Sequence, residues 1–188
     1  MKALHKAVFL DRDGVLTEPV TRADGDVTQP FNLSEFKLLS NAVRACETLR
    51  GLNYLVFVVS NQGRVGDGVI SMADHLEMHA VLMSSLDIDD AVYALDRNSE
   101  YFKPGTMMID ELCGKWGVDR EASWMVGDRW RDIAAGNRAA IRRNVFVGRN
   151  LSPEDRFHID ETMVYRFADD VMDAALTIVM NDILEGTR

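Results

Sequence analysis

The chain has 188 residues, of which 47% are hydrophobic and 27% are charged, and its formal net charge is −9 at pH 7. This length and apolar content suffice for one domain with a full hydrophobic core over residues 1–188. The acidic balance, without a block of lysines and arginines, excludes duplex nucleic acid as the main partner, because nonspecific binding to a duplex needs a basic surface.

The N-terminal segment does not have the pattern of a signal peptide, because His5, Lys6 and Asp11 interrupt its short apolar run. No stretch is long and apolar enough to predict a membrane span. The two cysteines, Cys46 and Cys113, lie in helix-like patterns without CxxC spacing, which is typical of reduced, buried thiols. These features predict a cytoplasmic protein that does not contact a membrane.

Apolar runs of strand length alternate with segments of helical period along the whole chain. This alternation predicts an α/β fold with a mainly parallel sheet and helices on both faces. The expected strands cover residues 6–11, 53–60, 90–95, 123–127, 144–148 and 163–166. The expected helices cover residues 40–50, 71–86, 104–116, the segment from the fourth strand to about 139, and 169–184. A polar loop is expected up to residue 33 and an irregular segment at 151–161.

The sequence also predicts where several helices begin or end. Gly51 suits the C-terminal cap of the first helix, and Ser71 with Asp74 resembles a capping box in which aspartate replaces the usual glutamate. Pro104 is expected in the first turn of its helix. The buried face of the helix over 40–50 is expected to contain Ala42, Val43, Cys46 and Leu49.

Polar residues follow the ends of four expected strands, directly or in the next loop. In open α/β sheets, ligands bind beyond the carboxyl ends of the strands, so we expect these residues to meet at one rim. They are Asp11, Asp13, Ser60, Asn61, Gln62, Lys103 and Asp128. Clustered carboxylates repel one another unless a cation lies among them, and a small group of oxygen ligands suits Mg²⁺. Asp11 and Asp128 are the best candidates for side-chain ligands.

These residue types can carry out phosphoryl transfer. One carboxylate can attack phosphorus and form an aspartyl-phosphate, and a second acid two residues later can protonate the leaving oxygen and then activate water. Lys103 and Ser60 can hold the phosphoryl oxygens whose charge must be stabilised in the transition state.

Four motifs in this order, "FLDRDGVL", "VVSNQG", "KPG" and "MVGDRWRDIAAGNRAA", resemble those of the haloacid dehalogenase (HAD) superfamily of phosphohydrolases, over roughly residues 6–148. The resemblance implies a Rossmann-like, doubly wound sheet. It implies that Asp11 is the nucleophile and a Mg²⁺ ligand, and that Asp128 is another ligand. Asp13 would be the general acid/base, with its backbone carbonyl on the metal. Ser60, Asn61 and Lys103 would bind phosphate, and Asp132, one helical turn after Asp128, would orient a metal-bound water or Lys103.

Within the superfamily, "FLDRDGVL" with "SNQ" is most similar to the branch of the D-glycero-D-manno-heptose 1,7-bisphosphate phosphatases and histidinol-phosphate phosphatases. In that branch Arg129 would match a cationic substrate contact, and segments 19–22 and 60–63 would line the substrate site. We therefore expect substrate contacts from Gln62, Gly63, Arg64 and Arg129. A small phosphorylated metabolite is the expected partner, with sugar phosphates and bisphosphates ranked first. Histidinol phosphate and nucleotide or 3′-phosphate ends follow.

The chain departs from this branch in ways that concern the substrate. Many members carry a zinc loop of CxH and CxC before the motif lysine, but "YALDRNSEYFKPG" has neither residue type, so we expect no zinc. Phe102 stands where the family often has arginine, and "NQGRVGDG" places Arg64 and Asp67 in an altered loop. No insertion is long enough for a cap domain, so the fold is expected to be capless, with loops 17–33, 62–70 and 96–103 setting specificity.

The sequence also leaves open two hypotheses from other functional classes. A receiver-like signalling module also combines acids, a hydroxyl and a lysine on an α/β sheet, although its phosphorylated aspartate follows the third strand. A catalytically idle scaffold is the other. His75 and His79 have metal-pair spacing, but a surface or partly buried helix face is expected, and Trp116, Trp124 and Trp130 are expected to pack.

Overall fold

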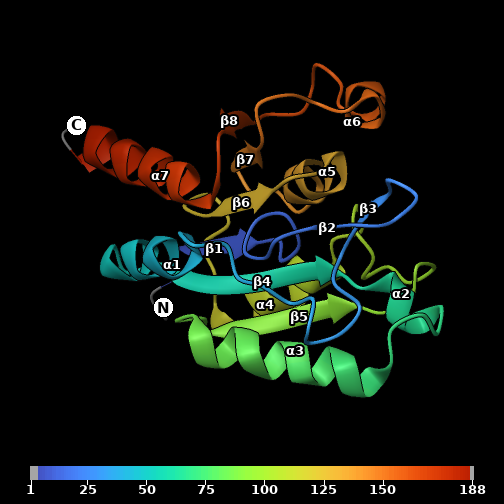
Figure 1. Cartoon of the computed structure of the whole chain (residues 1–188). Helices are drawn as coiled ribbons and strands as arrows, with labels where there is room; N and C mark the ends of the chain where they lie inside the picture. The colour runs from blue at the N-terminus through green and yellow to red at the C-terminus, as the bar shows by residue number, and fades with distance from the viewer. Residues whose placement is uncertain (1–3, 187–188) are drawn as a thin grey trace.

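The computed structural model describes residues 4–186, in which six parallel strands form one sheet with helices on both of its faces (Figure 1). From edge to edge the strands are β5 (Asp90–Ala94), β4 (Leu55–Asn61), β1 (Ala7–Leu10), β6 (Trp124–Gly127), β7 (Arg143–Val147) and β8 (Arg166–Ala168). Counted along the chain, this is the order 3-2-1-4-5-6 of Rossmann-type sheets. The predicted fold class is confirmed, and the receiver-like order 2-1-3-4-5 is not the one observed.

The central strand β1 shows why the apolar runs become strands. All four of its residues are fully buried, with Val8 and Leu10 in the core on one face and Ala7 and Phe9 in the core on the other. A parallel strand that is covered on both faces has no polar side, so it reads as a continuous apolar run.

The helices divide between the two faces of the sheet. One core cluster joins α1 (Ala42–Gly51), α3 (Met72–Ser85) and α7 (Val171–Gly186), and the other joins α4 (Met107–Trp116) and α5 (Trp130–Arg138). The sheet is therefore doubly wound. None of the helices that the structure describes is long and apolar enough to cross a membrane.

The strand order places a crevice next to β1. From β1 the chain continues to β4 on one side and returns to β6 on the other, so the order reverses between β1 and β6. Asp11 continues the pairing, because its backbone N–H donates to the carbonyl of Val126 at 2.9 Å. Ligands of open α/β sheets bind at such a reversal, beyond the carboxyl ends of the strands.

Four short elements lie in segments predicted as loops. The loop after β1 contains an antiparallel hairpin of β2 (Val20–Thr21) and β3 (Val27–Thr28), and α2 (Gly63–Gly66) follows β4. In Figure 1 the hairpin and α2 lie beyond the arrowheads of β4 and β5. The segment predicted as irregular contains α6 (Pro153–His158), which Ser152 caps by accepting from the Asp155 N–H. A pair of two-residue strands is too short to produce a periodic pattern, so the sequence did not reveal it.

Several predicted helix details need correction, whereas the Ser71 cap is confirmed, since its side chain accepts from the Asp74 N–H. Val43 is 41% exposed, because α1 turns Ala42, Ala45, Cys46 and Leu49 inward instead. Gly51 is still helical, and the left-handed residue after α1 is Asn53, with a φ of 61°. Pro104 lies before α4, which begins at Met107. The final strand begins at Arg166, later than predicted.

Cysteine, tryptophan and histidine side chains outside the predicted site lie in packed positions. Cys46 and Cys113 are free and buried, as predicted. Trp124 is 1% exposed, and Trp130 stacks on His158 with ring centroids 4.1 Å apart. His75 is buried with its ring edge-on to Tyr93, and burial lowers its pKa to about 4.

Candidate active site

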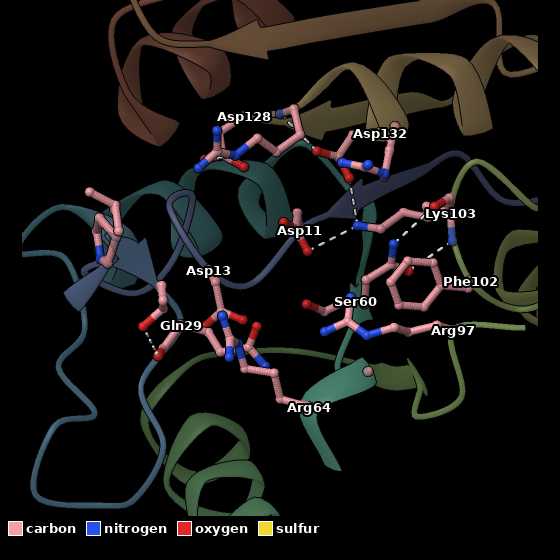
Figure 2. Close-up of a pocket in the computed structure, with 17 residues that line it drawn as sticks. Asp11, Asp13, Gln29, Ser60, Arg64, Arg97, Phe102, Lys103, Asp128 and Asp132 are labelled. Atoms are coloured by element: carbon pink, nitrogen blue, oxygen red, sulfur yellow. Dashed lines mark hydrogen bonds and ion pairs between the residues drawn. The ribbon is translucent and has the colours of Figure 1, made fainter. Parts of the chain in front are cut away.

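A cavity of about 300 Å³ lies at the carboxyl edge of the sheet, next to the reversal of strand order (Figure 2). Ten of the eleven site residues predicted from the sequence line it, which leaves out only Gln62. The ten are Asp11, Asp13, Ser60, Asn61, Gly63, Arg64, Lys103, Asp128, Arg129 and Asp132. The hairpin contributes Val27, Thr28 and Gln29, whereas Pro19 is the only member of the predicted segment 19–22 at the cavity.

Lys103 is the cation at the inner end of the cavity, and it is only 1% exposed. Its Nζ lies 2.9 Å from Asp11 Oδ1, 2.6 Å from Asp132 Oδ1 and 2.7 Å from the carbonyl oxygen of Val59. Burial by itself would lower the pKa of Lys103, but the charges of the two carboxylates outweigh it and raise the pKa. The ammonium group is thus held charged beside Asp11 with all three of its hydrogens directed at acceptors.

Asn61 positions the backbone of Lys103. Its side-chain Nδ2 donates to the Lys103 carbonyl at 3.0 Å, and its Oδ1 accepts from the Lys103 N–H at 2.8 Å. The side chain therefore joins the end of β4 to the loop that carries the lysine. Asn61 was predicted as a phosphate ligand, and in the structure its amide is committed to Lys103.

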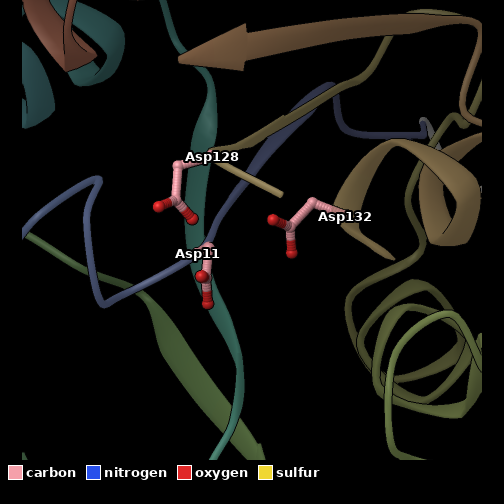
Figure 3. A group of neighbouring side chains, drawn as sticks. All are labelled: Asp11, Asp128 and Asp132. Atoms are coloured by element: carbon pink, nitrogen blue, oxygen red, sulfur yellow. The ribbon is translucent and has the colours of Figure 1, made fainter. Parts of the chain in front are cut away.

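Three carboxylates converge beyond the ends of β1 and β6 (Figure 3). Asp11, Asp128 and Asp132 offer ligand atoms that all lie within 4.8 Å of one another. Burial and the charges of the other two acids raise the pKa of Asp128 well above its usual range. Burial and the charge of Asp11 also raise the pKa of Asp132, to about 6, in spite of Lys103. The cluster holds more negative charge than Lys103 alone balances.

The two acids from the fourth motif differ in their partners. Asp132 is satisfied, since Oδ1 accepts from Lys103 and Oδ2 accepts from the Arg129 N–H at 3.0 Å. Asp128 Oδ1 is buried without a hydrogen-bond partner among the described residues. A buried carboxylate oxygen without a donor fits a hard cation, and Asp11 and Asp128 fit Mg²⁺ better than Asp132 does.

Gly14 makes room for Asp128. It has a φ of +88°, and a Cβ on it would lie 2.3 Å from Asp128 Oδ2. The turn after the two acids therefore has to be glycine both for its backbone conformation and for the position of a carboxylate more than a hundred residues later in the chain.

Asp13 is held by four hydrogen bonds at the side of the cavity. Its Oδ1 accepts from Arg12 Nε and Thr17 Oγ1, both at 3.0 Å. Its Oδ2 accepts from Arg12 Nη2 at 3.0 Å and from Gln62 Nε2 at 2.6 Å. Arg12 is fully buried and was not predicted as a site residue, although its place between two acids at the end of a buried strand was a usable signal.

Gln62 is predicted to contact substrate, and in the structure it is fully buried and is not among the residues that line the cavity. Its Nε2 donates to Asp13 and, at 3.1 Å, to Ser60 Oγ, and its Oε1 accepts from Arg12 at 2.8 Å and from Gln29 at 3.1 Å. Gln62 therefore connects the first two motifs with the hairpin, and acts on the site through Asp13 and Ser60.

Four arginines form the outer rim of the cavity. Arg64 and Arg129 were predicted, whereas Arg97 and Arg131 were missed. Arg97 belongs to the loop after β5 that was expected to set specificity, but its side chain could not be assigned to the cavity without the positions of the neighbouring loops. The cavity thus has a buried acidic end with one lysine and an outer end with several guanidinium groups.

Known proteins resemble the chain in sequence and in fold. A family profile described as HAD-hydrolase-like matches residues 101–174. D-glycero-beta-D-manno-heptose-1,7-bisphosphate 7-phosphatase of Rhodopseudomonas palustris is 31% identical over 160 residues, 77% of this chain and 85% of that protein. D-glycero-alpha-D-manno-heptose-1,7-bisphosphate 7-phosphatase of Burkholderia mallei is 30% identical over 158 residues, 76% of this chain and 80% of that protein.

A solved structure shares the fold. D,D-heptose 1,7-bisphosphate phosphatase from B. bronchiseptica, complexed with magnesium and phosphate, superposes with a TM-score of 0.75 at 19% identity, over 94% of this chain and 99% of that one. This likeness shows that the two chains share a fold. The sequence matches at 30% and 31% identity show that the chain belongs to the HAD superfamily of phosphatases, in the family of the heptose-1,7-bisphosphate 7-phosphatases.

Proposed function

We propose that this member of the HAD superfamily is a Mg²⁺-dependent phosphomonoesterase that hydrolyses a sugar bisphosphate through an aspartyl-phosphate on Asp11. The single observation that carries the proposal is the buried end of the cavity, where Asp11 lies next to Lys103 and close to Asp128, whose Oδ1 has no hydrogen-bond partner within residues 4–186. A nucleophilic carboxylate, a fixed cation and a place for a metal ion are the parts that phosphoryl transfer needs.

In the proposed first step, a carboxylate oxygen of Asp11 attacks phosphorus and the ester bond to the leaving alcohol breaks. Lys103 lies 2.9 Å from Asp11, so its charge is close to the phosphoryl oxygens as negative charge develops on them. Ser60 lines the same end of the cavity and is a candidate donor to the phosphoryl group. Asn61 would contribute by fixing the Lys103 backbone.

We assign proton transfer to Asp13. It would give a proton to the leaving oxygen, which departs as the alcohol, and then take a proton from the water that attacks phosphorus in the aspartyl-phosphate, releasing inorganic phosphate and restoring Asp11. To reach the leaving oxygen, Asp13 has to exchange some of its four hydrogen bonds for one to the substrate. Arg12 and Gln62 would act as positioning residues that hold the Asp13 carboxylate in place between turnovers.

Asp11 and Asp128 would hold Mg²⁺ together with the backbone carbonyl of Asp13. Asp132 would orient Lys103 through the ion pair between Asp132 Oδ1 and Lys103 Nζ. When bound, the ion neutralises the acidic cluster and polarises a phosphoryl oxygen. Oxygen ligands in a small cluster suit Mg²⁺ rather than zinc. We propose no zinc site.

Sugar bisphosphates are the substrate class that we favour. The relatives at 30% and 31% identity carry names of heptose-1,7-bisphosphate 7-phosphatases, and the rim of this cavity supplies guanidinium groups for a second anionic group. Histidinol phosphate and nucleotide or 3′-phosphate ends are the alternatives that the same chemistry permits. We also propose that residues 1–188 act as one capless domain.

The test is a panel of phosphate esters assayed for release of inorganic phosphate, with Mg²⁺ and with EDTA. The panel contains heptose 1,7-bisphosphate, histidinol phosphate, a nucleoside 3′-phosphate and p-nitrophenyl phosphate. We expect hydrolysis with Mg²⁺, loss of hydrolysis with EDTA, and the highest kcat/KM for the bisphosphate. Absence of hydrolysis of every ester, or full activity in EDTA, would contradict the proposal. Recovery of a long-lived phosphoprotein without turnover would instead favour the receiver-like function.

A further inference from the structure

We propose that Arg97 binds the second anionic group of the substrate and so determines the preference of the site for doubly anionic sugars over monophosphates. The inference rests on the proposed phosphatase function, and it concerns a residue that no motif identifies. Arg97 lies in the loop between β5 and α4, outside the strand-end residues that form the acidic end of the cavity.

The side chain of Arg97 is directed by its packing against Gly63. A Cβ on Gly63 would lie 2.6 Å from Arg97 Cγ, 3.1 Å from Arg97 Nε and 3.0 Å from the ring of Phe102. Any larger residue at position 63 would displace the arginine. In Figure 2, Arg97 runs from its loop below Phe102 toward Ser60 and Arg64. Glycine at position 63 therefore leaves the space through which this guanidinium reaches the cavity.

The loop that carries Arg97 is also fixed. The Gly66 N–H donates to the carbonyl of Leu95 at 3.1 Å, and a Cβ on Gly66 would lie 2.3 Å from that carbonyl oxygen. The short helix α2 thus packs backbone to backbone against the start of the loop. Because α2 and this loop follow neighbouring strands, β4 and β5, the contact fixes the backbone at the start of the loop that carries Arg97.

The guanidinium of Arg97 keeps donors for a ligand. Its Nε donates to Asp67 Oδ2 at 2.9 Å, and the Phe102 ring lies 5.8 Å from its Cζ. An arginine has five N–H donors, so one acceptor leaves most of them for an anion. The side chain is 49% exposed, which allows it to exchange water for a ligand.

Arg64 adds charge on the same side of the cavity. Within residues 4–186 its ion pair is with Asp26 at 3.9 Å, which is long, and its guanidinium lies over the Phe31 ring at 5.3 Å. A substrate whose first phosphoryl group lies between Ser60 and Lys103 would direct its other end to these two arginines. A planar guanidinium binds phosphate with two parallel hydrogen bonds, which a lysine cannot reproduce.

The test compares two sugars that differ only in the second anion, heptose 1,7-bisphosphate and heptose 7-phosphate, with p-nitrophenyl phosphate as a third substrate. We expect the wild-type kcat/KM to be at least about tenfold higher for the bisphosphate, as one charge-assisted pair implies. Arg97→Met should lower kcat/KM for the bisphosphate by about 10- to 100-fold and leave the other two substrates within about threefold. Arg97→Lys should give an intermediate loss, because it keeps the charge without the planar fork.

The matched control is Arg149→Met. Arg149 is an exposed arginine whose guanidinium pairs with Asp169 at 2.8 Å, away from the cavity lining, so its removal should leave all three substrates unchanged. Equal losses on all three substrates in Arg97→Met would show a structural role and overturn the proposal. An unchanged preference for the bisphosphate would overturn it as well.

A binding measurement separates this inference from the proposed function. Heptose 1-phosphate, which carries only the second anion, is titrated calorimetrically into wild-type protein and into Arg97→Met. Binding that weakens at least about tenfold in the variant supports the role of Arg97 even if the wild type hydrolyses none of the esters. Absence of wild-type binding, or equal binding by both proteins, contradicts it.

Discussion

The inner and outer ends of the cavity are built in opposite ways. At the inner end, Lys103 and Asp132 are 1% exposed and each is held by several partners. At the outer end, Arg97 and Arg129 have side chains 49% exposed, with ion pairs of 2.9 Å to Asp67 and 3.5 Å to Asp128. A group that must be placed within tenths of an ångström is buried and multiply bonded, whereas a group that selects among ligands keeps donors free.

Substitutions at the two ends of the cavity should therefore affect activity in different ways. A substitution at the inner end disturbs a network in which each charge depends on the others, so its effect on the rate is large and not additive. A substitution at the rim removes one exposed contact, and its effect depends on which substrate is used. Effects on activity should therefore decrease from the inner end of the cavity outward.

Asp11→Asn should have the largest effect. It removes the nucleophile, so kcat should fall by about 10³-fold or more on every ester, with KM changed much less. Asp24→Asn is the matched control, because the exposed Asp24 accepts from the Asp26 N–H through an oxygen that asparagine retains. Steady-state phosphate release measures both. Activity of Asp11→Asn within tenfold of wild type would remove Asp11 from the role of nucleophile.

Gly14→Ala should have the next largest effect, and Gly25→Ala is its control. Both glycines have left-handed backbones, with φ of +88° and +86°, so each alanine should lower the free energy of unfolding by about 1 kcal/mol. Only the Cβ at position 14 meets a side chain, Asp128 Oδ2 at 2.3 Å, whereas position 25 is open. Gly14→Ala alone should therefore lower kcat/KM, by about 100-fold, because Asp128 is displaced. Equal activity of the two variants would show that this contact does not matter.

The acidic cluster should make the metal-free protein less stable as pH rises. The pKa of Asp132 is raised from 3.8 in the unfolded chain to about 6 in the fold, so its stabilising contribution is full below about pH 4 and is lost as pH rises through about 6. Asp128 shifts in the same direction. In EDTA, the free energy of unfolding should fall by about 1–3 kcal/mol between pH 4.5 and pH 7.5.

Denaturant titration at several pH values measures this slope. Asp132→Asn should flatten it, and added Mg²⁺ should restore stability more at pH 7.5 than at pH 4.5, since the metal binds the ionised acids. If wild type and Asp132→Asn had the same slope in EDTA, the repulsion assigned to this cluster would not be the cause.

Arg131→Met should have the smallest effect. Arg131 pairs with Glu154 at 2.9 Å on the surface, with side chains 37% and 54% exposed, and such pairs contribute about 0.5 kcal/mol or less. We expect an unfolding free energy within about 0.5 kcal/mol of wild type and a kcat/KM lowered about two- to fivefold. A loss as large as that of Gly14→Ala would show that the rim is as tightly coupled as the inner end.

The same contrast explains which residues could be predicted. Asp11, Asp128 and Lys103 follow buried strands or precede a helix in recognisable motifs, and parallel strands bring their carboxyl ends to one edge. Arg97 and Gln29 have no such signal, because their positions depend on how two loops pack. Gln62 is the opposite case. Its motif predicted a substrate contact, whereas in the structure its amide is buried and hydrogen-bonded to Arg12, Gln29, Asp13 and Ser60.

The α/β class, the parallel sheet and the strand-end residues of the inner end could be predicted from the sequence, because hydrophobic period and residue type are local properties. Tertiary packing leaves Asp128 Oδ1 without a donor among residues 4–186, satisfies Asp132, and makes Gly14 the neighbour that gives Asp128 its space. Packing also places the Arg97 side chain against Gly63 and in the lining of the cavity. These facts depend on distances between segments far apart in the chain, which packing sets and local pattern does not.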